Sequence, residues 1–168
     1  MAKVLLSLGA NIGNPNKQLN DVISKLREQF PKLKQSSIYE TEPVRANPDL
    51  NFLNMGVSFD TVLSPISLLD LLMSIENNVG RIRTKGIMNE PRLIDIDIIY
   101  FGDFISNTSK LNIPHPRAHE RRFVLEPLAE IEPEFIDPIH GISIALLLSR
   151  CSDTHWVKKQ ADALMDVA

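Results

Sequence analysis

Two aspartates, Asp95 and Asp97, lie inside a run of strand-forming residues, IDIDIIYF, at positions 94–101. Alternate residues of a β-strand share a face, so both carboxylates would point the same way, about 7 Å apart at ~3.3 Å per residue. The other face is then expected to carry Ile94, Ile96, Ile98 and Tyr100. Aspartate is rare in strands and neighbouring like charges destabilise them, so the pair needs a chemical explanation.

Two interpretations of the aspartate pair are open at this point. The aspartates are either solvated charges on the outer face of a sheet, or ligands of one or two divalent cations that remove their repulsion. A few hard carboxylate ligands suit Mg²⁺, which keeps part of its water and takes further oxygens from phosphates. Zinc is disfavoured because neither histidine nor cysteine lies beside the pair.

Basic residues are concentrated around the aspartates in the sequence. Eight of the chain's 18 lysines and arginines fall between positions 81 and 122, namely Arg81, Arg83, Lys85, Arg92, Lys110, Arg117, Arg121 and Arg122. Arginine binds phosphate oxygens two at a time, which suits a polyphosphate held beside metal-binding carboxylates. The alternative is a solvated surface with ordinary ion pairs. Taken with the aspartates, the cations favour a magnesium–polyphosphate site.

The histidines and the first glycine-containing turn carry weaker signals. His115 is flanked by Pro114 and Pro116, which disfavours a continuous helix there, and it is interpreted as a phosphate contact. His119, His140 and His155 are interpreted as surface or structural residues. The turn GANIGN at 9–14 matches neither a dinucleotide-binding motif nor a Walker loop, so it is interpreted as a tight structural turn.

Length and composition describe one ordinary globular domain over residues 1–168. The chain is 43% hydrophobic and 23% charged, with a net charge of −3, which does not favour nucleic acid as a partner. A single cysteine fits a reducing cytosol. The apolar run near the N-terminus is too short for a signal peptide, and no window is long enough to span a membrane. We therefore expect a cytoplasmic protein without a membrane partner.

Hydrophobic periodicity gives the order of the elements. The patterns predict a strand at 3–9, a helix capped by Asn14 and Pro15, strands at 33–40 and 52–61, a helix opened by Ser64 and Pro65, and the aspartate strand. Gly56 is a candidate β-bulge. This β-α-β-β-α-β order predicts an α+β, ferredoxin-like core: an antiparallel sheet with two helices on one face. The remaining residues should add a short strand and one or two helices, most clearly at 141–150.

Six motifs in a fixed order resemble those of one enzyme family. They are LSLGANIGN, YETEP, FLN, ENNVGRIR, PRLIDIDIIYFG and IPHPRAHERRF, and they run from the first strand to about residue 133. Together they resemble 6-hydroxymethyl-7,8-dihydropterin pyrophosphokinase of the folate pathway. Each motif is modest alone, whereas the ordered set is specific.

The resemblance implies a reaction and a set of roles. ATP would donate its β,γ-pyrophosphoryl group to the hydroxymethyl oxygen of the dihydropterin and leave as AMP, with two Mg²⁺ ions on Asp95 and Asp97. The implied ATP contacts are Arg81, Arg83, Arg92, Ile98, Lys110, Leu111, Asn112, His115 and Arg121. The implied pterin contacts are Thr41, Val44, Phe52, Asn54, Asp95 and Phe123. The implied catalytic residues are Arg81, Arg92 and Asp97.

The pterin assignments agree with the chemistry of a flat heterocycle, which favours aromatic faces and an amide that both donates and accepts. Core packing is the alternative for Phe52 and Phe123, and simple solvation for Asn54. Two positions depart from the family pattern: Glu90 replaces a usual glycine, and Phe52 replaces a frequent tyrosine. Glu76, near a helix end, is expected to pair with Arg81 or Arg83.

Two other functions are compatible with parts of the pattern. A ferredoxin-like RNA-binding module would need exposed aromatics where the acidic pair lies. A nucleotide cyclase or polymerase-palm enzyme would share the two strand aspartates but would release inorganic pyrophosphate. Two arrangements of the chain are also open: a monomer, and a chain fused to, or acting before, dihydropteroate synthase.

Overall fold

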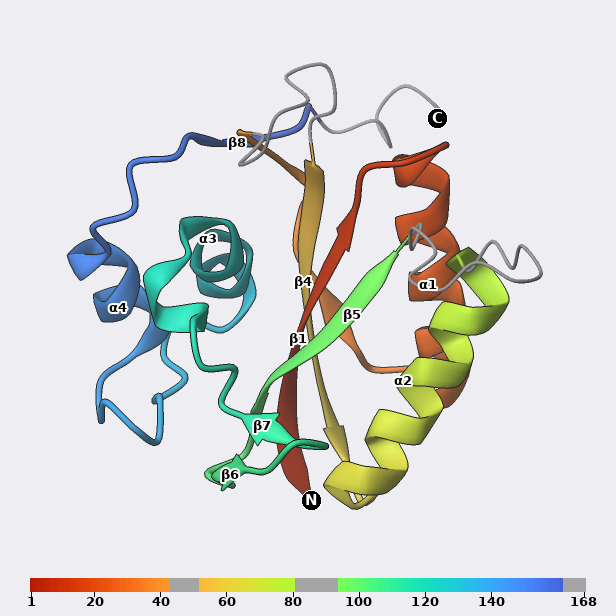
Figure 1. Ribbon diagram of the computed structural model, residues 1–168, viewed down its shortest axis with the longest axis horizontal. Coiled ribbons are helices and arrows are strands. Elements are labelled where there is room, and N and C mark those ends of the chain that lie inside the picture. The colour runs from red at the N-terminus through yellow and green to blue at the C-terminus, as the bar shows by residue number, and fades with distance from the viewer. Residues whose placement is uncertain (43–51, 81–93, 162–168) are drawn as a thin grey trace.

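The computed structural model describes residues 1–42, 52–80 and 94–161 (Figure 1). The strands are β1 (Ala2–Ala10), β2 (Lys34–Gln35), β3 (Tyr39–Thr41), β4 (Phe52–Thr61), β5 (Asp95–Phe101), β6 (Ser106–Asn107), β7 (Asn112–Ile113) and β8 (Val157–Lys159). The helices are α1 (Pro15–Gln29), α2 (Pro65–Gly80), α3 (Arg122–Ile131) and α4 (Ile144–Arg150), with a 3₁₀ turn at Ala118–Glu120. Among them, no helix has both the length and the apolar character needed to cross a membrane.

The main sheet is antiparallel and has the strand order β5-β1-β4-β3-β8, with β2 also paired to β4. Two β-α-β connections, one through α1 and one through α2, place β1 and β4 next to each other at its centre. This is the predicted ferredoxin-like arrangement. β8, from the C-terminal part of the chain, extends the sheet beyond β3.

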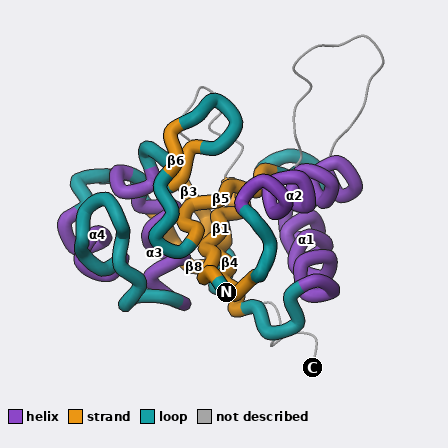
Figure 2. The backbone as a smooth tube through the Cα atoms, turned by 90° about the horizontal axis from the view of Figure 1, so that it is seen from below, coloured by secondary structure: helices purple, strands orange, loops and turns teal. Residues whose placement is uncertain are grey.

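The sheet lies between two layers of helices, α1 and α2 on one side and α3 and α4 on the other (Figures 1 and 2). Alternation along β1 divides its side chains between two cores: Val4, Leu6 and Leu8 pack in the α1/α2 cluster, and Leu5 packs in the α3/α4 cluster. One face of β1 and its neighbours therefore packs entirely in the larger core. The opposite face is divided between the smaller core and an open surface.

Local signals fix the starts of the first two helices as the sequence predicts. The Asn14 side chain accepts a hydrogen bond from the Lys17 N–H at 3.2 Å, with Pro15 at the first helical position. The Ser64 hydroxyl accepts one from the Ser67 N–H at 3.1 Å before α2. Gly13, in the turn before α1, has a φ of 73°, a conformation that favours glycine.

Two details of the predicted strands are wrong. The strand expected at 33–40 is divided into β2 and β3, because the Ser37 N–H donates to the Glu130 carboxylate of α3 between them. Gly56 is not a bulge, since it pairs in regular register with Ser7. Its lack of a side chain has another cause: a Cβ there would lie 3.0 Å from Leu128 Cδ2 and 3.1 Å from the Pro127 carbonyl carbon, so α3 packs directly on the strand.

A bulge in β5 changes the expected face of Tyr100. Leu5 pairs with Tyr100 and Leu6 with Ile98, so Ile99 is the extra residue. Tyr100 consequently packs in the α3/α4 core instead of sharing a face with Ile98. Its hydroxyl donates to the buried Asp137 carboxylate at 2.7 Å, and its ring lies 5.0 Å from that of Phe135.

Replacing Tyr100 with Phe should destabilise the fold. The substitution keeps the ring packing but removes a buried donor to Asp137, which should lower the free energy of unfolding by about 1–3 kcal/mol in urea denaturation. Tyr39→Phe is the matched control, because the Tyr39 hydroxyl bonds the Glu130 carboxylate at 3.1 Å and that side chain is 24% exposed, whereas the Asp137 side chain is 3% exposed. A larger loss from the control than from Tyr100→Phe would contradict the importance of the Asp137 bond.

Candidate active site

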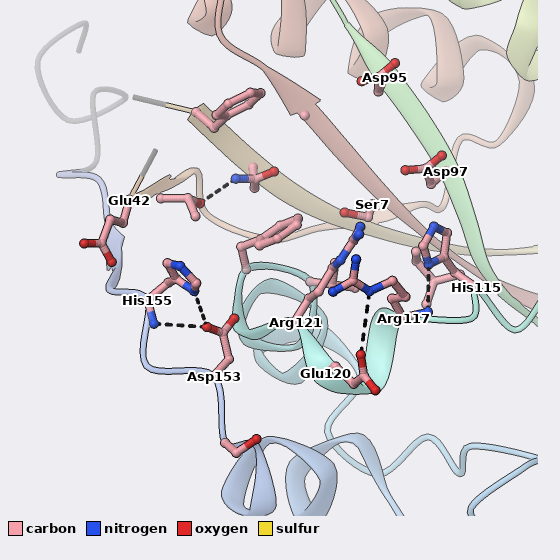
Figure 3. A pocket seen from close by; sticks show the side chains of 18 residues that line it. Ser7, Glu42, Asp95, Asp97, His115, Arg117, Glu120, Arg121, Asp153 and His155 are labelled. Atoms are coloured by element: carbon pink, nitrogen blue, oxygen red, sulfur yellow. Dashed lines mark hydrogen bonds and ion pairs between the residues drawn. The ribbon is translucent and has the colours of Figure 1, made fainter. Parts of the chain in front are cut away.

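A pocket of about 680 Å³ opens over the face of the sheet where α3 begins. Its floor is formed by Ser7 and Gly9 of β1, Asp95 and Asp97 of β5, and Asn54 of β4. Strand register brings these residues together, since Ser7 pairs with Asp97, and Gly9 pairs with both Asp95 and Asn54. They lie on the same side of the sheet as the α3/α4 core, at the end that these helices leave uncovered (Figure 3).

Asp95 and Asp97 are both exposed and point into the pocket from β5 (Figure 3). The residue between them is anchored, because the Ile96 N–H donates to the Glu76 carboxylate of α2 at 2.7 Å. Glu76 thus contacts β5, while its expected partners Arg81 and Arg83 lie outside the described residues. Within the described ranges, no group of three or more His, Cys, Asp or Glu side chains could hold a metal. A cation at this pair would need further oxygen ligands from water or substrate.

Cationic and polar groups from the segment after β7 face the aspartates. His115, Arg117 and Arg121 line the pocket (Figure 3). The His115 N–H donates to the Ile99 carbonyl oxygen at 3.2 Å, which holds the histidine against β5. Arg117 forms an exposed ion pair with Glu120 at 3.6 Å, and Arg121 is half-buried. Two of these three residues, His115 and Arg121, are the ones the sequence assigns to phosphate.

Burial lowers the pKa of His115, and the charges of Arg121 and Arg117 lower it further against the opposing effect of Asp97. The Arg117 N–H donates to His115 Nδ1 at 3.3 Å, so the neutral ring carries its proton on Nε2 and can donate a hydrogen bond from there. Because folding depresses this pKa, the neutral ring contributes stability above the ordinary histidine pKa, and the contribution is lost as the pH falls through the folded value.

The other end of the pocket is built for a flat, polar molecule. Asn54 is buried, and its amide N–H donates to the Thr41 hydroxyl. Its Oδ1 lies so close to Gly9 that a Cβ there would approach it to 3.2 Å. Phe52, which is 39% exposed, and Phe123, which is half-buried, also line this space. Exposure argues against core packing as the main role of Phe52.

Arg121 and Phe123 join the two ends of the pocket. The Arg121 guanidinium carbon lies 5.7 Å from the centre of the Phe123 ring, within the range of a cation–π contact. The two residues flank Arg122, the first residue of α3. The position of the start of α3 therefore determines where the Phe123 ring and the Arg121 charge lie in the pocket.

The structure brings together eight of the predicted site residues: Thr41, Phe52, Asn54, Asp95, Asp97, His115, Arg121 and Phe123. Four others do not line the pocket. Ile98 and Leu111 are buried in the α1/α2 core, and Lys110 and Asn112 are exposed around β7. The remaining predicted residues, Val44, Arg81, Arg83 and Arg92, lie outside the described residues, as does Glu90.

Several pocket residues were not predicted. They are Ser7, Gly9, Glu42, Ile99, Arg117, Glu120, Val124, Ser152, Asp153 and His155. Six of them, Ser7, Gly9, Glu42, Ile99, Arg117 and Glu120, belong to motifs quoted above, and Arg117 also belongs to the basic cluster, so position in a motif was the available signal. His155, interpreted from the sequence as a surface or structural residue, is exposed and also lines the pocket, 2.6 Å from Asp153, whose hydrogen bond and negative charge raise its pKa.

Paired carboxylates facing cations on a ferredoxin-like sheet are a combination that suits phosphoryl transfer. The family model of 7,8-dihydro-6-hydroxymethylpterin-pyrophosphokinase (HPPK) matches residues 5–133. The Bacillus subtilis 2-amino-4-hydroxy-6-hydroxymethyldihydropteridine pyrophosphokinase is 43% identical over 128 residues, covering 75% of each chain. The chain therefore belongs to the HPPK family.

Other relatives are longer than this chain. Pneumocystis carinii folic acid synthesis protein fol1 is 40% identical over 156 residues, which cover 92% of this chain but 21% of that protein. The crystal structure of wild-type Plasmodium falciparum HPPK-DHPS with pteroate has the same fold, with a TM-score of 0.69 at 18% identity, covering 89% of this chain and 42% of that one.

Histidine titration tests the electrostatics of the pocket. In the metal-free protein we expect His115 to titrate below the ordinary value of about 6.5 and His155 above it, by ¹H–¹⁵N NMR of the imidazole rings. Asp97→Asn should lower the pKa of His115 further, because the Asp97 charge raises it. Asp153→Asn should lower the pKa of His155 and serves as the matched substitution. His115 titrating above His155 would contradict this arrangement.

Proposed function

We propose that the chain, as one pyrophosphokinase domain over residues 1–168, transfers pyrophosphate from ATP to 6-hydroxymethyl-7,8-dihydropterin. The hydroxymethyl oxygen attacks the β-phosphorus, the bond from that phosphorus to the α,β-bridging oxygen breaks, and AMP leaves. The hydroxyl proton is lost as the new ester forms. The pterin pyrophosphate would then be consumed by dihydropteroate synthase in folate biosynthesis. Family membership supports this reaction.

The observation that carries the proposal is the division of one pocket into two chemical halves. Asp95, Asp97 and His115 provide carboxylate and imidazole groups at one end, and Asn54 and Phe52 provide an amide and an aromatic face at the other. A substrate that joins a flat heterocycle to a group under phosphorylation needs these halves next to each other. Neither half alone would distinguish this reaction from other phosphoryl transfers.

Asp95 and Asp97 suit magnesium. They are exposed carboxylates at alternate positions of one strand, and few such ligands leave most of the coordination sphere to water and phosphate oxygens. When bound, two Mg²⁺ ions would neutralise phosphate charge and lower the pKa of the pterin hydroxyl. The same pair would repel a triphosphate in the absence of divalent cations, which makes magnesium dependence part of the proposal.

The protein's own residues would bind and orient the two substrates. Neutral His115 would donate a hydrogen bond from Nε2 to a phosphate oxygen, and Arg121 would contribute a fixed positive charge. Asp97 is the nearest candidate for accepting the hydroxyl proton. We assign Arg81, Arg83 and Arg92 to the triphosphate, with Arg81 and Arg92 stabilising the transferring group. Adenine is assigned to a place outside this pocket, near Ile98 and against the backbone of Lys110, Leu111 and Asn112.

Phe52 and Phe123 are proposed to stack on the two faces of the pterin, and Thr41, Val44 and Asn54 to contact its edge. The hydrogen bond from the Asn54 amide to Thr41 orients that amide, leaving Oδ1 as an acceptor for a pterin N–H. Asp95 would contact both the cation and the pterin end.

The direct test is to incubate the chain with ATP, Mg²⁺ and the reduced pterin, and to separate the products by chromatography. We expect AMP and pterin pyrophosphate in equal amounts, and no turnover when EDTA removes the magnesium. Release of inorganic pyrophosphate without AMP would instead favour cyclase- or polymerase-type chemistry. Tight binding of single-stranded RNA with no turnover would favour the RNA-binding alternative.

Asp97→Asn should reduce pterin pyrophosphorylation by at least about 100-fold, because the substitution removes a charged magnesium ligand. Thermal stability should stay the same or rise slightly, since the repulsion between Asp95 and Asp97 is relieved. Asp60→Asn, an exposed aspartate on β4 away from the pocket, is the control and should keep normal activity. Near-normal turnover by Asp97→Asn would exclude Asp97 from metal binding.

A further inference from the structure

A segment near the C-terminus, residues 151–156, forms part of the pocket wall. Ser152, Asp153 and His155 line the pocket, although they lie far in sequence from the other lining residues. The segment also lies beyond residues 5–133, the part of the chain that matches the family model. Its role in the site is therefore not given by family membership. We name residues 151–156 the C-terminal clasp.

The clasp holds the start of α3 through Arg122. The Asp153 carboxylate accepts a hydrogen bond from the Arg122 backbone N–H at 3.0 Å. The Arg122 side chain also bonds the clasp. It donates from Nε to the Asp153 carbonyl oxygen at 3.1 Å and from Nη2 to the Cys151 carbonyl oxygen at 3.3 Å. A guanidinium fork that bonds two backbone carbonyls fixes geometry more tightly than a single point charge would.

Asp153 is well placed to act as a rigid anchor. Its side chain is 11% exposed, and it also accepts hydrogen bonds from the His155 N–H at 3.0 Å and from the His155 ring at 2.6 Å. Burial alone would raise the pKa of Asp153, but the hydrogen bonds from Arg122 and His155 outweigh burial and lower it. The carboxylate is thus ionised and fully engaged at neutral pH.

The other end of the clasp holds the end of β3. The Glu42 N–H donates to the Trp156 carbonyl oxygen at 3.1 Å, and the Trp156 N–H donates to the Glu42 carboxylate at 3.2 Å. Glu42 directly follows Thr41, whose hydroxyl accepts the Asn54 amide. The next residues, Val157–Lys159, pair with β3 as β8. The clasp is therefore bonded to two walls of the pocket at once.

We propose that the C-terminal clasp is a positioning element that sets the separation of these two walls for the pterin ring. One wall is the start of α3, which carries Phe123, and the other is the end of β3, which carries Thr41. Arg122 and Asp153 are its positioning residues, and neither needs to contact the substrate. The inference rests on the proposed function, since it takes the pterin to occupy the space between these walls.

The test measures binding without turnover. Isothermal titration calorimetry of the 168-residue chain would use the reduced pterin with magnesium and α,β-methylene-ATP, in which the bond that the reaction breaks is replaced. Arg122→Gln should weaken pterin binding about tenfold, as expected for loss of charged hydrogen bonds. Affinity for the nucleotide analogue should fall by less than pterin affinity does, by about threefold, because Arg121 moves with the start of α3 whereas Asp95, Asp97 and His115 lie on other segments.

Arg122→Lys separates charge from geometry, because lysine keeps the charge and lacks the fork. It should weaken pterin binding almost as much as Arg122→Gln does. Asp153→Ala should give a similar loss, and the double variant Arg122→Gln/Asp153→Ala should be less than additive, since both substitutions break the same contact. Arg150→Gln, at an exposed arginine one residue before the clasp, is the matched control and should bind normally.

A purely structural role would lower the melting temperature of the Arg122 and Asp153 variants while leaving pterin affinity unchanged below that temperature, and this result would overturn the clasp. Equal losses of pterin and nucleotide affinity would also overturn it. Failure of the unsubstituted chain to bind pterin would overturn the proposed function together with the clasp. Normal binding by the unsubstituted chain and by all variants would overturn the clasp alone.

Discussion

The pairing of β5 with β1 is the constraint on which the site depends. Because alternate residues share a face, the register that sets Asp97 opposite Ser7 and Asp95 opposite Gly9 directs both carboxylates to the same side of the sheet. The same register continues across β1 to place Asn54 opposite Gly9. A shift of one residue would turn both aspartates toward the α1/α2 core, where an unpaired charge is costly. The same strand register therefore buries the core residues and places the site residues.

The bulge at Ile99 allows β5 to line the open pocket with its first residues and to pack under α3 and α4 with its last ones. Before it, β5 presents Ile96 to the core and aspartates to the pocket; after it, Tyr100 turns to the α3/α4 side and bonds Asp137. The strand thus passes from an open, charged surface to a covered, hydrophobic one. The start of α3 marks the boundary, because that helix covers the sheet only beyond the pocket.

Sequence reasoning recovered what depends on local pattern. Helix caps, strand periods and the order of elements predicted the ferredoxin-like core, and the acidic strand with nearby cations indicated residues that the structure brings together in one pocket. It failed where distant segments decide the outcome. The face of Tyr100 depends on a bulge that alternation cannot reveal, and the glycine at 56 is explained by α3 packing rather than by strand irregularity. His155 and Asp153 reach the site through the pairing of β8 with β3 and the hydrogen bonds with Arg122, which no local signal encodes.

The floor and the walls of the pocket differ in how firmly the rest of the fold holds them. The floor belongs to β1, β4 and β5, whose backbones are held by ladder hydrogen bonds and whose core-facing side chains pack in two cores. The walls at Thr41 and Phe123 belong to a strand end and a helix start, the positions where a fold is least constrained by its own hydrogen bonds. Contacts from another part of the chain are needed to hold such positions, and Arg122 with Asp153 supplies them at one wall, as Trp156 with Glu42 does at the other. On this reasoning, chemistry on the floor tolerates little change in the strands, whereas the fit of the heterocycle depends on residues that never touch it.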